Sequence, residues 1–194
     1  ILLAATLIFS GVLYHLIARR LPAGSGLNHW GAGAILFGLA YIGRLAWVLP
    51  DAHPGALVLD LIMVMSAVLF LLGIRQWLDH APVRLSMLAA VAVGYAVLHV
   101  GVVMVWSAKG RFVLLNVALA SVYAGIAING VLMRSTQVKP IQLPLSLLAA
   151  LMSGLSVLTL ARAIHIGTDG PAVMSAGWQA QIYYGYASLS VVLM

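Results

Sequence analysis

Apolar residues along this chain fall into long runs, each close to the roughly 20 residues that a helix needs to cross a hydrocarbon layer. Short polar, proline-containing or glycine-containing stretches separate the runs. The backbone inside a membrane must satisfy its own hydrogen bonds, and no β-barrel alternation is present, so each run is expected to be a helix. The pattern predicts an all-α fold, a seven-helix transmembrane bundle, with helices at about 1–18, 29–49, 56–77, 84–106, 112–133, 144–164 and 178–194.

The connections between the predicted helices are short. The second and third runs are joined by the turn Pro50-Asp51-Ala52-His53-Pro54-Gly55, and the other connections are of similar character. Short connections make consecutive helices antiparallel neighbours. The stretch from Asn28 to Trp77 is therefore predicted to form a helical hairpin, and alternate connections should lie at the same end of the bundle.

Basic residues are distributed unevenly between the two sets of connections. The second, fourth and sixth connections contain only Lys109 and Arg111. The first, third and fifth hold Arg19, Arg20, Arg75, Arg84, Arg134 and Lys139. Since cytoplasmic loops are enriched in Lys and Arg, this bias places the odd connections in the cytoplasm, the N-terminus outside and the C-terminus in the cytoplasm.

Composition supports a membrane protein and limits the other classes. The chain is 63% hydrophobic and only 7% charged, and its net charge of +6 comes from residues spread over short loops. No dense basic patch with interleaved aromatic residues is present, so no nucleic-acid partner is expected. The absence of cysteine excludes thiolate chemistry. Because the chain begins at Ile1 and stops inside an apolar run at Met194, it is expected to be part of a longer protein.

Charged residues inside the predicted spans mark a candidate binding site, because an ionisable group in a membrane is expensive unless it has a function or a partner. Arg44 and Arg162 lie near the outer ends of their helices, and Asp60 enters the third helix from the same side. The predicted ligand-binding residues are Arg44, Arg162, Asp60, Tyr41, Trp106, Trp178 and Gln181, with Trp47 as a further wall. Such a pocket suits an unidentified small anionic or amphipathic ligand. Alternatively, the arginines extend to headgroups or pair with Asp60 structurally, and the tryptophans form an interfacial belt.

Two histidines could bind a cofactor. His99 in the fourth helix and His165 near the end of the sixth are candidate ligands of haem b or a transition metal. Hydrogen-bonded histidines in the bundle, or a pH sensor, are the alternatives. The histidines at helix ends or in loops, His29, His53 and His80, are expected to be solvated.

Three segments of the hairpin carry a family resemblance. They are Asn28-His29-Trp30-Gly31-Ala32-Gly33, Leu39-Ala40-Tyr41-Ile42-Gly43-Arg44 and Gly73-Ile74-Arg75-Gln76-Trp77. Together they resemble the N-terminal multi-pass membrane sensory region of bacterial diguanylate cyclases. In that family a Trp-x-x-Gly opening, an intramembrane arginine before a proline-bearing outer turn and a Gly-x-Arg-x-aromatic exit recur. Arg111 and Arg162 also fit its spacing.

The resemblance implies a function. It implies a homodimeric sensor in the bacterial inner membrane that controls a cytoplasmic GGDEF domain, which makes cyclic di-GMP from GTP. The chain itself has no phosphate-binding loop, nucleophile elbow or metalloprotease motif, so catalysis would belong to another part of the protein. A haem-binding, cytochrome b-like or gas-sensing protein and a small transporter are the alternatives.

Overall fold

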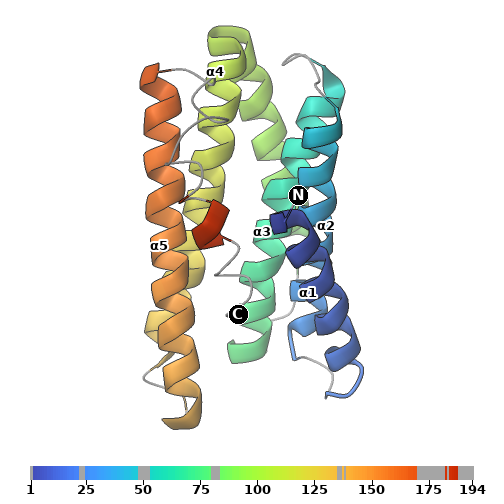
Figure 1. Cartoon of the computed structure of the whole chain (residues 1–194), viewed down its shortest axis with the longest axis vertical. Helices are drawn as coiled ribbons and strands as arrows, with labels where there is room; N and C mark the ends of the chain where they lie inside the picture. The colour runs from blue at the N-terminus through green and yellow to red at the C-terminus, as the bar shows by residue number, and fades with distance from the viewer. Residues whose placement is uncertain are drawn as a thin grey trace.

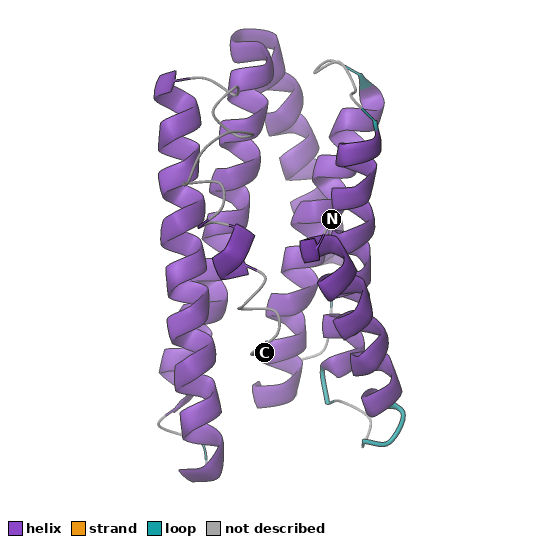
Figure 2. Ribbon diagram, in the orientation of Figure 1, coloured by secondary structure: helices purple, strands orange, loops and turns teal. Residues whose placement is uncertain are grey.

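The structure is a computed structural model that describes residues 2–21, 25–47, 53–79, 84–134, 137, 139–169, 182 and 184–187. These residues are almost entirely helical and include no strand (Figure 2). The helices are α1 (Leu2–Ala18), α2 (Leu27–Ala46), α3 (Pro54–Asp79), α4 (Leu85–Arg134) and α5 (Lys139–Asp169). A further helical turn covers 184–187. The all-α prediction is confirmed for this part of the chain.

Helix α4 covers two of the predicted spans without a break in its helical hydrogen bonding. Figure 1 shows its chain rising in one arm, folding over and descending in a second arm. A Cβ on Gly110 would lie 3.1 Å from the carbonyl oxygen of Val102, whereas eight residues of straight helix would separate the two by about 12 Å. The chain therefore reverses where the connection Ser107 to Arg111 was predicted, but it does so in a helical conformation rather than in a loop. Gly110 lets the chain reverse within a helical turn, because it has no side chain to collide with Trp106.

Other boundaries differ from the prediction for local reasons. The fifth labelled helix begins at Lys139 and continues to Asp169, whereas the predicted span was 144–164. Pro140 stands in its first turn, where a backbone amide has no helical partner to lose. Helix α2 ends earlier than predicted, with Trp47 already in an extended conformation. The predicted seventh helix at 178–194 lies outside the described residues except for Ile182 and 184–187.

Four helical segments are long and apolar enough to cross a membrane: Pro54–Leu78, Leu85–Trp106, Lys109–Arg134 and Lys139–Thr168. Helix α1 is apolar but shorter, and α2, which contains Asn28, His29 and Arg44, is not among the four. Large apolar side chains are exposed along every helix, for example Phe9 at 71%, Leu39 at 52% and Val97 at 67%. An apolar surface this extensive is typical of a protein whose helices face lipid.

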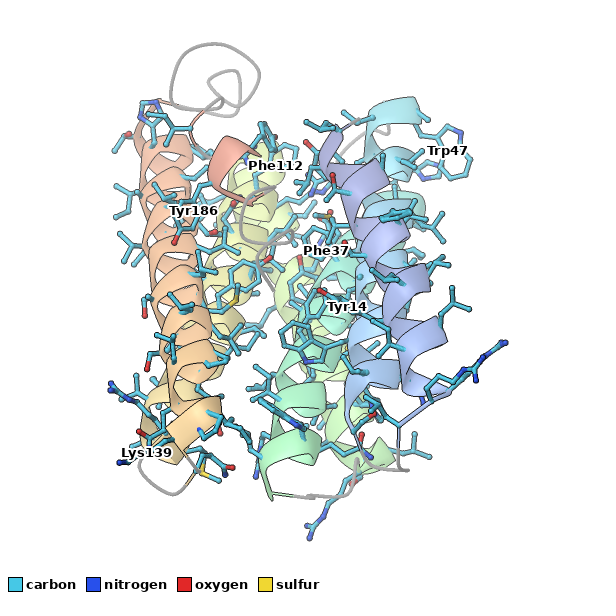
Figure 3. All side chains as sticks on the ribbon, turned by 60° about the horizontal axis from the view of Figure 1, so that its bottom comes forward. Tyr14, Phe37, Trp47, Phe112, Lys139 and Tyr186 are labelled. Atoms are coloured by element: carbon cyan, nitrogen blue, oxygen red, sulfur yellow. The ribbon has the colours of Figure 1, made fainter. Side chains whose placement is uncertain are left out.

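The helices pack as sequential neighbours, α1 on α2, α2 on α3, α3 on α4 and α4 on α5. Helix α3 is the central one: 56% of its apolar window is buried, against 11% for the first arm of α4. Side chains from all five helices meet in one core, including Leu7, Phe37, Val64, Ile126 and Met152. Figure 3 shows Phe37 and Tyr14 pointing into the space between the helices.

The two ends of the bundle can be named from the residues that Figure 3 labels there. At the Lys139 end lie six exposed basic residues, Arg19, Arg20, Arg75, Arg84, Arg134 and Lys139. The Trp47 end is where α2 ends, α3 begins and α4 folds over. The charge asymmetry read from the sequence is therefore a real asymmetry between the two ends of this bundle.

Backbones touch at the Lys139 end, where the beginning of α2 crosses α3. Gly26 precedes α2 with a φ of 74°, a left-handed conformation that favours glycine. A Cβ on Gly73 would lie 2.8 Å from the carbonyl oxygen of Gly26 and would collide with the ring of Trp30. That ring also packs edge-on against Phe70 at 5.5 Å. The crossing therefore requires glycine at both positions, Gly26 before α2 and Gly73 in α3.

We expect Gly73→Ala to destabilise the purified protein by about 1–3 kcal/mol, since the added methyl group has backbone and a fixed ring in its way. Gly94→Ala is the matched control, because a Cβ there meets nothing within 4 Å. Thermal unfolding in detergent measures both. Equal stability of the two variants would contradict the close crossing.

Candidate functional site

A fully buried carboxylate organises the polar residues near the Trp47 end. Asp60 lies in the second turn of α3 with 0% of its surface exposed. Its oxygens accept two hydrogen bonds from Arg111, one of 2.7 Å from Nε to Oδ2 and one of 3.3 Å from Nη2 to Oδ1. This bidentate geometry is the strongest arrangement available to an arginine and a carboxylate. Arg111 is itself 5% exposed, so the pair is an internal one.

Two further side chains reach the same carboxylate. Arg44 Nη1 lies 3.4 Å from Asp60 Oδ1 and 3.5 Å from the sulfur of Met63. His99 Nδ1 lies 3.8 Å from Asp60 Oδ2, beyond hydrogen-bond distance. Asp60 thus joins α2, α3 and both arms of α4. We call Asp60, Arg44, Arg111 and His99 the Asp60 cluster.

Phe112 supports the two arginines of the cluster. The guanidinium carbons of Arg44 and Arg111 each lie 5.1 Å from the centroid of its ring, a distance typical of cation–π interactions. Figure 3 labels Phe112 near the Trp47 end. The ring therefore compensates part of the desolvation of two neighbouring positive charges.

A second polar group lies beside α5. Arg162 Nη2 donates a 2.9 Å hydrogen bond to the hydroxyl of Tyr184, and its guanidinium carbon lies 5.1 Å from that ring. The Tyr184 ring meets Tyr41 of α2 edge-on at 6.0 Å. Tyr41 precedes Arg44 by three residues on α2, so the two side chains lie on one face of the helix. The described C-terminal turn is thus joined to α2 and α5 beside the Asp60 cluster.

The predicted site residues separate into three sets. Arg44 contacts Asp60, and Arg162 is linked to Tyr41 of α2 through Tyr184. Trp106 and Trp47 are 62% and 64% exposed. They do not wall the cluster, because Trp106 ends the first arm of α4, Trp47 follows the end of α2, and both rings are largely exposed. Trp178 and Gln181 lie outside the described residues.

Arg111 is the residue that the sequence prediction missed. It was placed in a connecting loop and counted as a topology signal, whereas it is buried and holds Asp60. With Arg111 removed, Lys109 alone remains as a basic residue of the fourth connection, so the charge bias between the two ends becomes larger. The available signal was Asp60 itself, because a carboxylate inside a span requires a cation from another helix.

The candidate cofactor ligands His99 and His165 lie in different surroundings. His99 faces Asp60 and stacks near Tyr95, whose ring centroid lies 5.9 Å away. His165 is half-buried in α5, and its carbonyl accepts a bond from Thr168. No three His, Asp or Glu side chains converge on a metal position among the residues described. His29, expected to be solvated, has a buried Nδ1, His53 is exposed, and His80 lies outside the described residues.

Two cavities lined by described residues lie away from the Asp60 cluster. A small central cavity of about 60 Å³ is lined by apolar and aromatic side chains that include Leu7, Phe37 and Met152. A larger groove of about 540 Å³ opens at the Lys139 end, with Trp30, Trp77 and Leu148 among its lining residues. Neither is lined by Arg44, Asp60 or Arg162, so neither is the pocket expected from the sequence.

No family model, curated protein or solved structure matches this chain. Its function is therefore argued from its own residues.

We expect Asp60→Asn to destabilise the protein by about 3–5 kcal/mol, because it leaves the buried Arg111 and the partly buried Arg44 without a counter-charge. Arg111→Gln should cost less, since Arg44 remains beside the carboxylate. In the double variant the two costs should not add, because each change removes the charge that the other leaves unpaired. Thermal unfolding of the single and double variants measures this coupling. Additive losses would contradict a direct pair.

Proposed function

We propose that this chain is the membrane-embedded sensory module of a signalling protein and that the Asp60 cluster is the part of it that responds to the signal. The module would have seven spans, with its N-terminus outside and its C-terminus in the cytoplasm, in the bacterial inner membrane. The observation that carries the proposal is the position of the cluster, which joins three helices beside the link from Tyr184 to Arg162 and Tyr41.

The cluster is suited to a switch because its contacts are unequal. Arg111 binds Asp60 in a bidentate manner, whereas Arg44 makes one longer contact to a carboxylate already in use. A modest change in charge or hydration at Arg44 would alter its pairing while the Arg111 pair persists. Because Arg44 belongs to α2, the altered pairing would change how α2 packs against α3 and α4. A two-state element of this kind is what a ligand needs in order to shift a population.

Tyr184 supplies a route from the cluster toward the C-terminus. Its hydroxyl accepts from Arg162, and its ring touches Tyr41, which lies one turn from Arg44 on the same helix. A rearrangement of Arg44 would thereby reach the turn at 184–187. Substitution of Tyr184 tests this route.

The output of the module is proposed from the resemblance described above. A cytoplasmic diguanylate cyclase acting as a homodimer would be controlled by the C-terminal segment of the bundle. The first arm of α4 offers a broad exposed apolar face, with Val93, Val97 and Met104 on its surface. In a membrane this face is available to lipid or to a second copy.

Topology is testable because the chain contains no cysteine. In intact cells we expect Trp47→Cys to react with a membrane-impermeant maleimide and Lys139→Cys to react only after permeabilisation. Both positions are exposed, and they lie at opposite ends of the bundle. Ala67→Cys, fully buried in the core, is the unreactive control. The reverse labelling pattern would place Lys139 outside and contradict the proposed orientation.

Signalling is testable in cells that express the full-length protein. We expect Tyr184→Phe to change the cyclic di-GMP level several-fold, because it removes the bond from Arg162 while keeping the ring. Tyr186→Phe is the matched control; it lies in the same turn and loses a bond to the Leu151 carbonyl on α5. Wild-type levels in both variants would contradict the Tyr184 route. Wild-type levels after deletion of residues 1–194 would contradict a cyclase output.

A further inference from the structure

The Asp60 cluster holds more positive than negative charge. Among its described side chains, Asp60 provides one carboxylate for two arginines, and Arg111 already uses both of its oxygens. Arg44 has one ion pair, at 3.4 Å, and that pair engages only its Nη1. Its side chain is 16% exposed, and it lies two residues before the end of α2. Arg44 thus has guanidinium N–H donors that Asp60 does not engage, and they can be reached from the Trp47 end.

Within the described part of the chain, two buried polar atoms beside this charge have no hydrogen-bond partner. They are the hydroxyl of Tyr95 and Nδ1 of His99. Tyr95 is only 5% exposed and His99 only 4%. Tyr95 lies one helical turn before His99, with the two ring centroids 5.9 Å apart, and His99 Nδ1 lies 3.8 Å from Asp60 Oδ2, so the Tyr95 side chain belongs to the same polar region. A buried polar group without a partner is costly and rare, and an absent ligand explains such a group.

We propose that a small monovalent anion, a halide, nitrate or short carboxylate, binds beside Arg44 and accepts hydrogen bonds from its guanidinium and from the Tyr95 hydroxyl. The anion supplies the negative charge that two arginines and one aspartate lack. This inference deepens the proposed function by naming the class of ligand, and it rests on that proposal only for its link to signalling.

Other occupants fit the same observations less well. A water molecule would satisfy the Tyr95 hydroxyl but would leave the surplus charge in place. A metal cation would meet two arginines at close range and would be repelled. An anion pairs with the hydroxyl and balances the charge, and charge-assisted hydrogen bonds to a guanidinium are among the stronger ones in proteins.

The test uses the purified chain in lipid nanodiscs at constant ionic strength, with gluconate as the bulky replacement anion. Chloride, nitrate and acetate are titrated separately, and the melting temperature is followed. We expect at least one of the three to raise the melting temperature with single-site saturation, since a ligand of the native state stabilises it. The three titrations distinguish a halide, a nitrate and a carboxylate as the preferred ligand.

Variants locate the site. Tyr95→Phe should weaken the apparent Kd about tenfold or more, because a hydrogen bond to a charged group is lost. In gluconate alone the same variant should melt at or above the wild-type temperature, because its unpartnered hydroxyl is gone. Arg44→Lys, which keeps the charge but loses the planar set of donors, should also weaken binding. Tyr186→Phe is the control and should titrate as the wild type does.

Several results would overturn the anion site. The first is a melting temperature that does not depend on any of the three anions. The second is an equal apparent Kd for Tyr95→Phe and the wild type. The third is a loss of stability in Tyr95→Phe without any dependence on anions, which would indicate a bridging water. None of these results bears on the Tyr184 experiment. Failure of anion binding and failure of the signalling proposal are therefore distinguishable.

Discussion

Burial of the Asp60 carboxylate is the constraint on which the arrangement of this bundle depends. A charge with no exposed surface, in a helix apolar enough to cross a membrane, is tolerated only if other segments bring it cations and hydrogen bonds. Arg111 meets that requirement from the second arm of α4, and it can do so because the chain reverses just before it, at Gly110. The sharp turn of α4 and the position of α3 at the centre of the bundle are in this sense consequences of one acid–base pair. Arg44 then ties α2 to the same point.

Different kinds of interaction stabilise the two ends of the bundle. At the Lys139 end, Gly26 and Gly73 let the backbones touch, and Trp30 fills the space beside them. Such close packing is rigid and does not respond to charge. Near the Trp47 end the contacts are ionic, directional and partly shared, so their strength depends on the charges around them. A stimulus would therefore act at the Trp47 end, while the Lys139 end keeps the helices in register. Trp30 and Gly73 also belong to the segments that carry the family resemblance, and their contact gives both residues a structural reason to be there.

The sequence allowed the helices to be predicted well and the site only in part. Apolar runs reveal spans because each run must satisfy its own backbone within the membrane, so α1, α2, α3, both arms of α4 and α5 were all expected. The reversal at Ser107 to Arg111 was expected as well, but as a loop, whereas the chain keeps a helical conformation through it. Arg111 was missed for that reason, since a residue assigned to a loop is not considered as an internal partner. The sequence prediction identified Arg44, Asp60 and Arg162 because a charged side chain inside a membrane span is energetically unfavourable. Trp106 was misplaced because helical periodicity cannot show that its ring lies past the last buried turn.

A surplus of charge explains why such a cluster would be suited to sensing rather than to stability alone. A ligand shifts an equilibrium between two packings only by the difference in its affinity for them, and moving a population from 1:99 to 99:1 requires about 5.5 kcal/mol of such difference. A neutral ion pair whose hydrogen bonds are all made would give a small anion no difference in affinity between the two packings. Two arginines that share one carboxylate would give such a difference, because the proposed anion would compensate the charge at Arg44 that Asp60 leaves unbalanced. In the proposal, the imbalance at Asp60 would thus give the bundle differential affinity for a ligand, and the Tyr95 hydroxyl, which has no partner among the described residues, would add to it.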